Sequence, residues 1–332
     1  MYNSISKKKV VIYGNCHTEA IYKILSMTPS FSEKYELCPI LPICQIKSDD
    51  YFKQKVFSEC DVFIHQSIRL NNRYGEQYAS EKIIRLLKHE CKIIAIPNVY
   101  HMPICFFSQY SPKEEFKRKG VTYFFRDYII DTLYNQGYSI KKIIEKYDNN
   151  NILKANKMHH DFEEFIEKVQ FREKDWDIKI SKFILDNYRQ YQLFFDPNHP
   201  TMFLLKYIAK SCMDILEVEY TEEEINKISL QEACYYEMPI CKITVKELGL
   251  NYGTKELRIG GNKLLSEKMF LKQYVRQYIA FEWQNKELNI WLRIKSKTLY
   301  IWLNFVRIIR NIGSGLKHII LLLHSLVVKR YE

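Results

Sequence analysis

Short apolar runs alternate with helical patterns through the first hundred residues, and this alternation constrains the fold most strongly. Three runs have the length and the apolar content of buried strands, at residues 9–13, 61–65 and 92–96, and residues 36–40 could form another strand. Helical periodicity separates them, most clearly at 18–27 and 78–89. Strands joined through helices form a parallel sheet that is covered on both faces. We therefore expect an α/β fold with three layers, α/β/α, around a central parallel sheet.

The pattern becomes helical beyond residue 111, which predicts a mainly helical C-terminal part. Helical periodicity is found at 127–147, 160–170, 178–193 and 201–216, and a capping box at 221–224 opens another helix. The predicted division is a parallel-sheet core (1–110), a helical part completing the core and the site (111–220), a connecting region (221–265) and a basic aromatic helical tail (266–332).

Most of the positive charge lies in the tail. The chain has 332 residues and a net charge of +11, and residues 271–332 hold 11 Lys and Arg against 3 Glu, which leaves +8 there. The longest apolar run in this segment, 319–323, is too short to span a bilayer. A basic helix with Trp residues can lie in a membrane interface. Contact with the inner leaflet and packing on the domain or on a second copy of the chain are both left open.

The cysteines favour a reducing compartment. There are nine, an odd number, and no two form a C-x-x-C. Residues 1–6 lack the apolar segment of a secretion signal. We expect a cytoplasmic protein, peripheral on the inner membrane face if the tail binds lipid, with no disulfide framework and no metal. Residues 159–164 resemble a metal cluster in composition only, and a solvated helix start is the alternative.

Gly14-Asn15-Cys16-His17 follows the first predicted strand and precedes a predicted helix. Such a turn presents its side chains at the carboxyl edge of the sheet, where open α/β sheets bind ligands. The dipole and unpaired N–H groups of a helix N-terminus favour the thiolate form of a cysteine. Cys16 is therefore a candidate nucleophile, with a buried structural cysteine as the alternative.

Asp196 lies three residues before His199, and two prolines fix the backbone around this histidine. The spacing allows a carboxylate to hold one ring nitrogen while the other nitrogen faces a nucleophile. A helix-capping turn with an exposed histidine is the alternative.

Polar residues also follow the third and fourth predicted strands. The amides of Gln66 and Asn98 could donate to an oxyanion, and Arg69 or Arg73 could hold a phosphate. All these turns lie at the same predicted edge of the sheet.

Four motifs together resemble the WcbI-type acetyltransferase family of polysaccharide biosynthesis. They are Gly-Asn-Cys at 14–16, Ile-His-Gln at 64–66, Ile-Pro-Asn at 96–98 and Asn-His-Pro-Thr at 198–201. The resemblance covers roughly residues 8–215. That family is similar to the SGNH/GDSL hydrolase-like fold, so the resemblance implies a sheet of the SGNH/flavodoxin-like kind. The sequence departs from SGNH hydrolases in having Cys16 where those enzymes have serine.

The resemblance implies a coenzyme A or acetyl-CoA site and acetylation of a capsular or surface polysaccharide. The acceptor would be a polysaccharide or a lipid-linked sugar. Cys16 takes the nucleophile position, and His199 and Asp196 match the base and the residue that orients it. Further candidates are Asn15, Gln66 and Asn98 for the oxyanion or substrate, and Gly14, His17, Arg69, Arg73, Tyr100 and Arg126 for the coenzyme.

Two mechanisms are open for such a transferase. In one, Cys16 attacks the thioester and carries the acetyl group. In the other, His199 activates the sugar hydroxyl directly, and Cys16 only shapes the pocket.

Two other classes of function compete with the transferase. An SGNH-like esterase or deacetylase would use the same site without coenzyme A. A non-enzymatic membrane or nucleic-acid binding protein would use the tail. We expect no nucleic-acid partner, because the charge lies outside the sheet domain and no recognised module motif appears. Self-association is left open.

Overall fold

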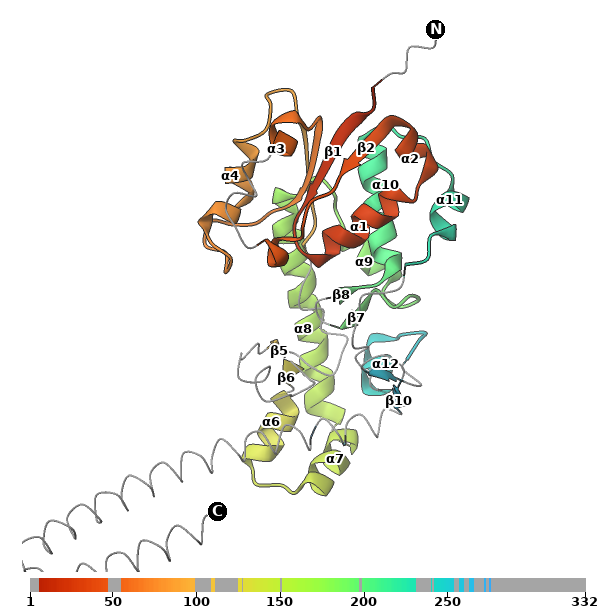
Figure 1. Cartoon of the computed structure of the whole chain (residues 1–332). Helices are drawn as coiled ribbons and strands as arrows, with labels where there is room; N and C mark the ends of the chain where they lie inside the picture. Colours follow the sequence, from red (N-terminus) through yellow and green to blue (C-terminus); the bar gives the residue numbers. More distant parts are fainter. Residues whose placement is uncertain are drawn as a thin grey trace, which may run out of the picture. The chain divides into compact units, whose positions relative to one another are not determined.

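The computed structural model describes residues 6–46, 55–98, 109–110, 125–126, 128–149, 151–196, 199–230, 240, 242–253, 257–259, 263–265, 272 and 275 (Figure 1). The chain divides into two compact units, Met1–Gln273 and Tyr274–Glu332. The sheet and the candidate site lie in the first unit. The predicted tail lies almost wholly outside the described residues, so its helical form, its membrane contact and the predicted domain boundaries stay predictions.

A parallel four-stranded sheet forms the centre of the first unit. Its order is β2-β1-β3-β4, with bounds Tyr35–Cys38, Lys8–Tyr13, Val62–Gln66 and Lys92–Ile96. All three strand pairings are parallel. The chain runs from β1 to β2 on one side and then crosses to β3 and β4 on the other. The strand order therefore reverses between β1 and β3, and ligands of such sheets bind beyond the carboxyl ends of the strands at this point.

Helices and 3-10 turns connect and cover these strands. In the first hundred residues they are α1 (Cys16–Ser26), α2 (Pro29–Lys34), η1 (Ile43–Gln45), α3 (Lys55–Glu59), η3 (Glu76–Tyr78) and α4 (Ser80–Ile84). Further along the chain are α6 (Tyr128–Asn135), α7 (Ile140–Asn149), α8 (Asn151–Arg172), η4 (Glu173–Asp175), α9 (Ser181–Asn187), α10 (Met202–Ile215), α11 (Glu222–Lys227) and α12 (Lys242–Leu248). The described residues also form three two-stranded sheets: β5 (Gln109–Tyr110) with β6 (Phe125–Arg126), β7 (Phe194–Asp196) with β8 (His199–Pro200), and β9 (Leu257–Ile259) with β10 (Lys263–Leu265).

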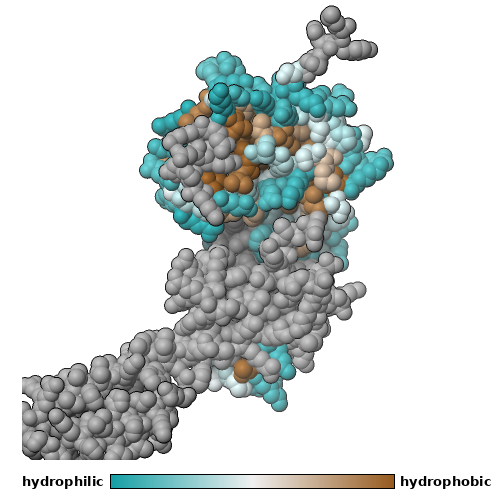
Figure 2. Space-filling model, viewed as in Figure 1, coloured by the Kyte–Doolittle hydropathy of each residue, from teal (hydrophilic) through white to brown (hydrophobic). Residues whose placement is uncertain are grey.

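Alternate side chains of β1 point to opposite faces of the sheet and enter two separate cores. Val10 and Ile12 lie in the larger core with α1, α2, α8, α9 and α10. Val11 and Tyr13 lie in the smaller core with Phe57 of α3 and residues of α4. Helices therefore cover both faces, and the predicted three-layer α/β/α fold is confirmed. Figure 2 shows hydrophilic side chains around the rim of the sheet region and apolar ones nearer its centre.

The four predicted strands are confirmed to within two residues at each end, but several predicted helices are wrong in extent. The single helix expected at 127–147 is two helices, α6 and α7, because Gly137 between them has a φ of +81°. The helix expected at 178–193 is the shorter α9, and that at 160–170 is the longer α8. The capping box forms in part. The Thr221 side chain accepts from the Glu224 N–H and caps α11, whereas the Glu224 side chain accepts a hydrogen bond from the Ser30 hydroxyl.

No helix in the described part of the chain combines the length and the apolar character needed to cross a membrane.

The turn between β1 and α1 depends on a very close approach at Gly14. A Cβ atom added there would lie 2.5 Å from Gln66 Oε1 and 2.5 Å from Thr18 Cγ2. Gln66 is fully buried, and both its Oε1 and its Nε2 are hydrogen-bonded, so moving it aside would break these bonds. Glycine is therefore the residue that this turn requires.

We predict that Gly14→Ala destabilises the fold by about 1–3 kcal/mol, the usual cost of overpacking a close-packed site. Urea unfolding of the purified protein measures it. Combining Gly14→Ala with Thr18→Ser removes one of the two clashing atoms and keeps the hydroxyl that donates to the Asn15 carbonyl at 2.6 Å. The double variant should recover part of the loss. A Gly14→Ala protein as stable as the wild type would contradict this account.

His65 makes the stability of the fold sensitive to acid. It is 5% exposed, it stacks on Phe63, and its Nδ1 has no hydrogen-bond partner among the described residues. Burial lowers the pKa of His65, an effect opposed by the Gln66 backbone and the charge of Asp177. A histidine with a lowered pKa contributes stability that is present above its unfolded pKa of about 6.5 and is lost as the pH falls below it.

The wild type should therefore lose more unfolding free energy between pH 7 and pH 5 than a His65→Leu variant does. Urea unfolding at each pH gives the two slopes, and the carboxylates common to both proteins cancel in the comparison. Identical slopes would show that His65 does not titrate in this range.

Candidate active site

The N-terminus of α1 holds Cys16 at the carboxyl edge of the sheet. The helix begins two residues earlier than the sequence predicts, because Asn15 caps it. The Asn15 side chain accepts a hydrogen bond from the His17 N–H at 3.0 Å. Cys16 is thus the first residue of α1, and its side chain is exposed. This placement agrees with the turn geometry that made Cys16 a candidate.

The Gln66 side chain fixes this turn against the neighbouring strands. Its Oε1 accepts from the Asn15 N–H at 2.9 Å, and its Nε2 donates to the Pro97 carbonyl at 3.2 Å. The Asn15 Nδ2 donates to Asn98 Oδ1 at 3.3 Å. The three predicted amides, Asn15, Gln66 and Asn98, therefore lie together. Gln66 has no exposed surface, which suits a positioning role, and its donation to an oxyanion stays a prediction.

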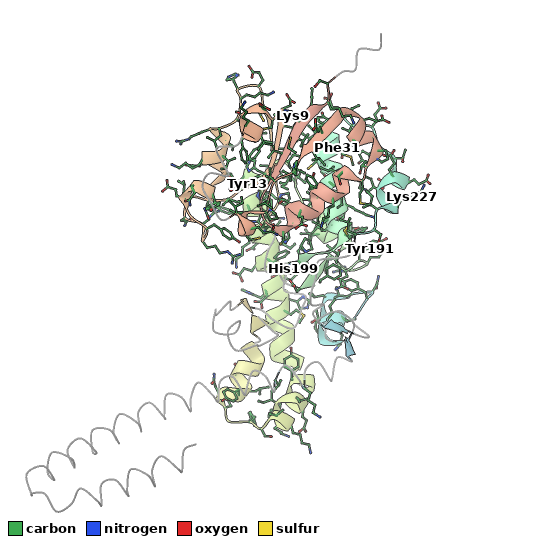
Figure 3. The ribbon with its side chains drawn as sticks, in the orientation of Figure 1. Lys9, Tyr13, Phe31, Tyr191, His199 and Lys227 are labelled. Atoms are coloured by element: carbon green, nitrogen blue, oxygen red, sulfur yellow. The ribbon has the colours of Figure 1, made fainter. Side chains whose placement is uncertain are left out.

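Asp196 and His199 form the second half of the site. The Asp196 Oδ2 lies 2.6 Å from His199 Nδ1, and its Oδ1 accepts from the His199 N–H at 2.9 Å. The carboxylate is 1% exposed, whereas the imidazole is 41% exposed. One carboxylate thus holds both the backbone and the ring of His199, in the geometry that the D-x-x-H spacing predicts. Figure 3 shows His199 and Lys9, at the start of β1, toward opposite ends of the sheet region.

Packing between α1 and α10 brings the two halves together. Residues of both helices share the larger core, and α10 begins three residues after His199. The ring centroids of His17 and His199 are 6.2 Å apart in an edge-to-face arrangement. Cys16 is close enough to His199 to raise the pKa of its ring. The structure therefore brings Cys16, His199 and Asp196 together at one edge of the sheet.

The pKa of His199 shows the electrostatics of this constellation. Burial lowers the pKa, but the hydrogen bonds with Asp196 and Cys16 and the charges of both outweigh burial and raise it to about 10. His199 is accordingly an imidazolium at neutral pH. A protonated ring cannot accept a proton from a hydroxyl, but it can stabilise an anion beside it.

Among the residues predicted to bind the coenzyme, Arg69 and Arg73 have described side chains, whereas Tyr100 and Arg126 do not. Arg69 and Arg73 lie in the exposed loop after β3, and the Arg73 guanidinium lies 4.8 Å over the Tyr74 ring. Burial raises the pKa of the Cys44 thiol, and the positive charge of Arg73 opposes this rise. Arg126 is in β6, where its side chain is not described, and Tyr100 lies outside the described residues. The role of each in binding a coenzyme stays a prediction.

Cys44 is a residue that the sequence analysis does not single out. It is exposed in η1, and the N–H of the preceding Ile43 donates to the Gly14 carbonyl at 2.8 Å. No local pattern in the sequence predicts this hydrogen bond, because Gly14 and Ile43 lie far apart in the chain.

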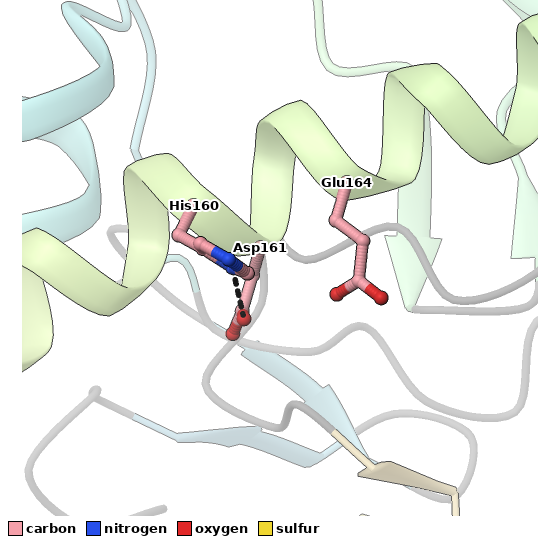
Figure 4. Close-up of side chains that lie close together, drawn as sticks. All are labelled: His160, Asp161 and Glu164. Carbon is pink, nitrogen blue, oxygen red and sulfur yellow. Dashed lines mark ion pairs between the residues drawn. The ribbon is translucent and has the colours of Figure 1, made fainter.

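Away from this site, Figure 4 shows His160, Asp161 and Glu164 close together on α8. Their possible ligand atoms lie within 4.8 Å of one another, and His160 Nδ1 is 3.9 Å from Asp161 Oδ1. The residues lie in the middle of α8 and not at a helix start, which corrects that interpretation of the sequence. Exposed charges on one helix do not make a metal site, and we assign none to them.

We predict that Asp196→Asn lowers the pKa of His199 from about 10 toward the ordinary histidine value near 6.5. NMR titration of the ring protons measures it directly. Asp186→Asn, which removes an exposed carboxylate paired with Lys182, is the matched control and should leave the His199 titration unchanged. A histidine with a raised pKa contributes stability that is present below pH 6.5 and lost as the pH rises toward 10. An unchanged midpoint in Asp196→Asn would exclude this carboxylate as the cause.

Comparison with known proteins agrees with this architecture. No curated protein matches the chain. A solved structure of WcbI, described as a novel polysaccharide biosynthesis enzyme in a native form without a disulfide bond between coenzyme A and one of its cysteines, matches with a TM-score of 0.64 and 20% identity. The match covers 82% of this chain and 90% of that one, and at this identity it shows a shared fold. The family model of the polysaccharide biosynthesis enzyme WcbI matches residues 9–221, which span β1, the site and α10. The chain therefore belongs to the WcbI family of polysaccharide biosynthesis enzymes.

Proposed function

We propose that this protein transfers an acetyl group from acetyl-CoA to a sugar hydroxyl through an acetylated Cys16. The observation that carries the proposal is the exposed Cys16 thiol beside His199, whose ring is bonded to Asp196 at 2.6 Å and has a raised pKa. A thiolate beside an imidazolium is a strong nucleophile at neutral pH. Membership of a polysaccharide biosynthesis family supports a sugar as the acceptor.

The residues present suit an acyl-coenzyme A substrate. An exposed thiol at a helix N-terminus can reach a thioester carbonyl, and the helix dipole and the cation of Arg73 favour an anionic ligand nearby. The similar WcbI structure, whose description names coenzyme A and a cysteine, supports the same class of ligand. The side-chain amides of Asn15 and Asn98 are the proposed donors to the oxyanion.

In the first step, the Cys16 thiolate attacks the thioester carbonyl carbon. The carbon–sulfur bond of the thioester breaks, and His199 gives its proton to the departing thiolate. In the second step, the now neutral His199 removes the proton of the sugar hydroxyl, whose oxygen attacks the acetyl-cysteine. Cys16 leaves as a thiolate beside a protonated His199, which restores the starting state.

The charge on His199 favours this covalent route over direct attack. Direct attack needs a neutral base in the resting enzyme, and the pKa of about 10 leaves little of it at neutral pH. The covalent route needs the neutral ring only after the first step, when Cys16 no longer carries a negative charge.

We expect acetyl-CoA, added without an acceptor, to acetylate Cys16 and to release one free thiol for each protein molecule. Intact-mass analysis with peptide mapping measures the adduct. Cys16→Ala should form no adduct, and His199→Ala should form it at least about 10²-fold more slowly, the lower end of general acid–base contributions. His159→Ala replaces an exposed histidine on α8. It is the matched control and should react as the wild type does.

Calorimetric titration separates the ways in which this could fail. Saturable binding of coenzyme A with a clear preference over ADP is expected. The wild type could bind coenzyme A without becoming acetylated while the Cys16→Ala variant still transfers acetyl groups. That result would show direct attack as the mechanism. No binding by a folded protein, together with acetate release from a simple aryl ester, would favour the esterase or deacetylase instead.

A further inference from the structure

A second exposed thiol lies beside the Cys16 turn. Of the six free cysteines in the described part of the chain, Cys16 and Cys44 are exposed and the other four are buried. Cys44 is the middle residue of η1, and the N–H of the preceding Ile43 donates to the Gly14 carbonyl oxygen at 2.8 Å. This hydrogen bond ties η1 to the turn that presents Cys16. Two solvent-accessible thiols are thus held at the same edge of the sheet.

The charges around Cys44 affect the pKa of its thiol. Burial raises the pKa of Cys44, the charge of Cys16 raises it further, and Arg73 lowers it. The electrostatic effects of Cys16 and Arg73 on the Cys44 thiol agree with the hydrogen bond that places η1 beside the Cys16 turn. The positive charge of Arg73 favours the thiolate form of Cys44.

We propose that Cys44 is the resolving thiol of Cys16. When Cys16 is joined to a small thiol in a disulfide, the Cys44 thiol loses its proton to water and its sulfur attacks the sulfur of Cys16. A Cys16–Cys44 bond forms, the bond between Cys16 and the small thiol breaks, and the small thiol leaves as a thiolate that then takes up a proton. A dithiol reductant afterwards returns both residues to free thiols, itself becoming a disulfide.

The small disulfides of the cell supply the first step. An exposed cysteine paired with an imidazolium reacts readily with low-molecular-weight disulfides, and the resulting mixed disulfide blocks any chemistry at Cys16. A nearby second thiol converts this blocked form into an internal disulfide that a dithiol reductant can open. The inference rests on the proposed function only in taking Cys16 as the reactive thiol.

The aromatic disulfide DTNB tests the proposal on the reduced full-length protein. One equivalent should react first at Cys16, releasing one dye molecule and leaving the second dye attached. Attack by Cys44 should then release the second dye. The wild type should end with two dyes released, no adduct by intact mass, and a Cys16–Cys44 cross-link by peptide mapping. Cys44→Ser should release one dye and keep its adduct at least about tenfold longer.

The matched control is Cys38→Ser, which removes a buried thiol six residues before Cys44 and should behave as the wild type does. Cys60 and Cys91 provide an internal control. Their sulfurs lie only 3.5 Å apart, but both are buried and burial raises the pKa of each, so they should remain thiols. Thermal unfolding shows whether each variant is folded.

Two outcomes would overturn the proposal. One is a wild-type adduct that lasts as long as that of Cys44→Ser. The other is a cross-link from Cys16 to a different cysteine. Because DTNB requires neither coenzyme A nor a sugar, both outcomes are independent of whether acetyl transfer is detected.

Discussion

The hydrogen bond between the Asn15 N–H and Gln66 Oε1 holds the edge of the sheet where the site forms. The same buried amide donates to the Pro97 carbonyl, so one side chain joins the residues that follow β1 and β4 to the end of β3. The bond is possible because Gly14 has no side chain to occupy the space that Gln66 fills. A shorter residue in place of Gln66 would leave a buried N–H and a buried carbonyl without partners, which costs about 1–3 kcal/mol each.

The other half of the site depends on contacts between segments far apart in the chain. The N–H of Thr201 donates to the Leu193 carbonyl at 2.8 Å, and its hydroxyl donates to the Gln192 carbonyl at 2.8 Å. These bonds close the short β7-β8 hairpin and set the start of α10. Because α10 packs on α1 in the larger core, the hairpin is held beside Cys16. The geometry of the candidate site therefore depends on the packing of two helices as well as on the edge of the sheet.

The sequence predicts the strands well because their signal is local. β1, β3 and β4 are short runs rich in Val and Ile and bounded by turn residues, a composition typical of strands in a covered parallel sheet. β2, Tyr35–Cys38, contains neither residue and has the weakest signal of the four. Helix limits are less predictable, since they depend on single residues such as the Asn15 cap and the positive φ of Gly137. The spacing of Asp196 and His199 reveals their hydrogen bonds because it is also local. The approach of Cys44 to Cys16 is set by one long-range backbone hydrogen bond, which no pattern in the sequence shows.

The position of one proton determines what this site can do at neutral pH. A buried carboxylate that bonds both the N–H and the ring of His199 stabilises the imidazolium more than the surroundings oppose it. The proposed function depends on this cation, which stands beside Cys16 before any substrate arrives and favours attack by sulfur over removal of a proton from a hydroxyl. The proposed role of Cys44 depends on it too, because disulfide exchange also proceeds through a thiolate. A nearby exposed thiol would protect a site of this kind, whereas the closer pair of Cys60 and Cys91 is kept unreactive by burial.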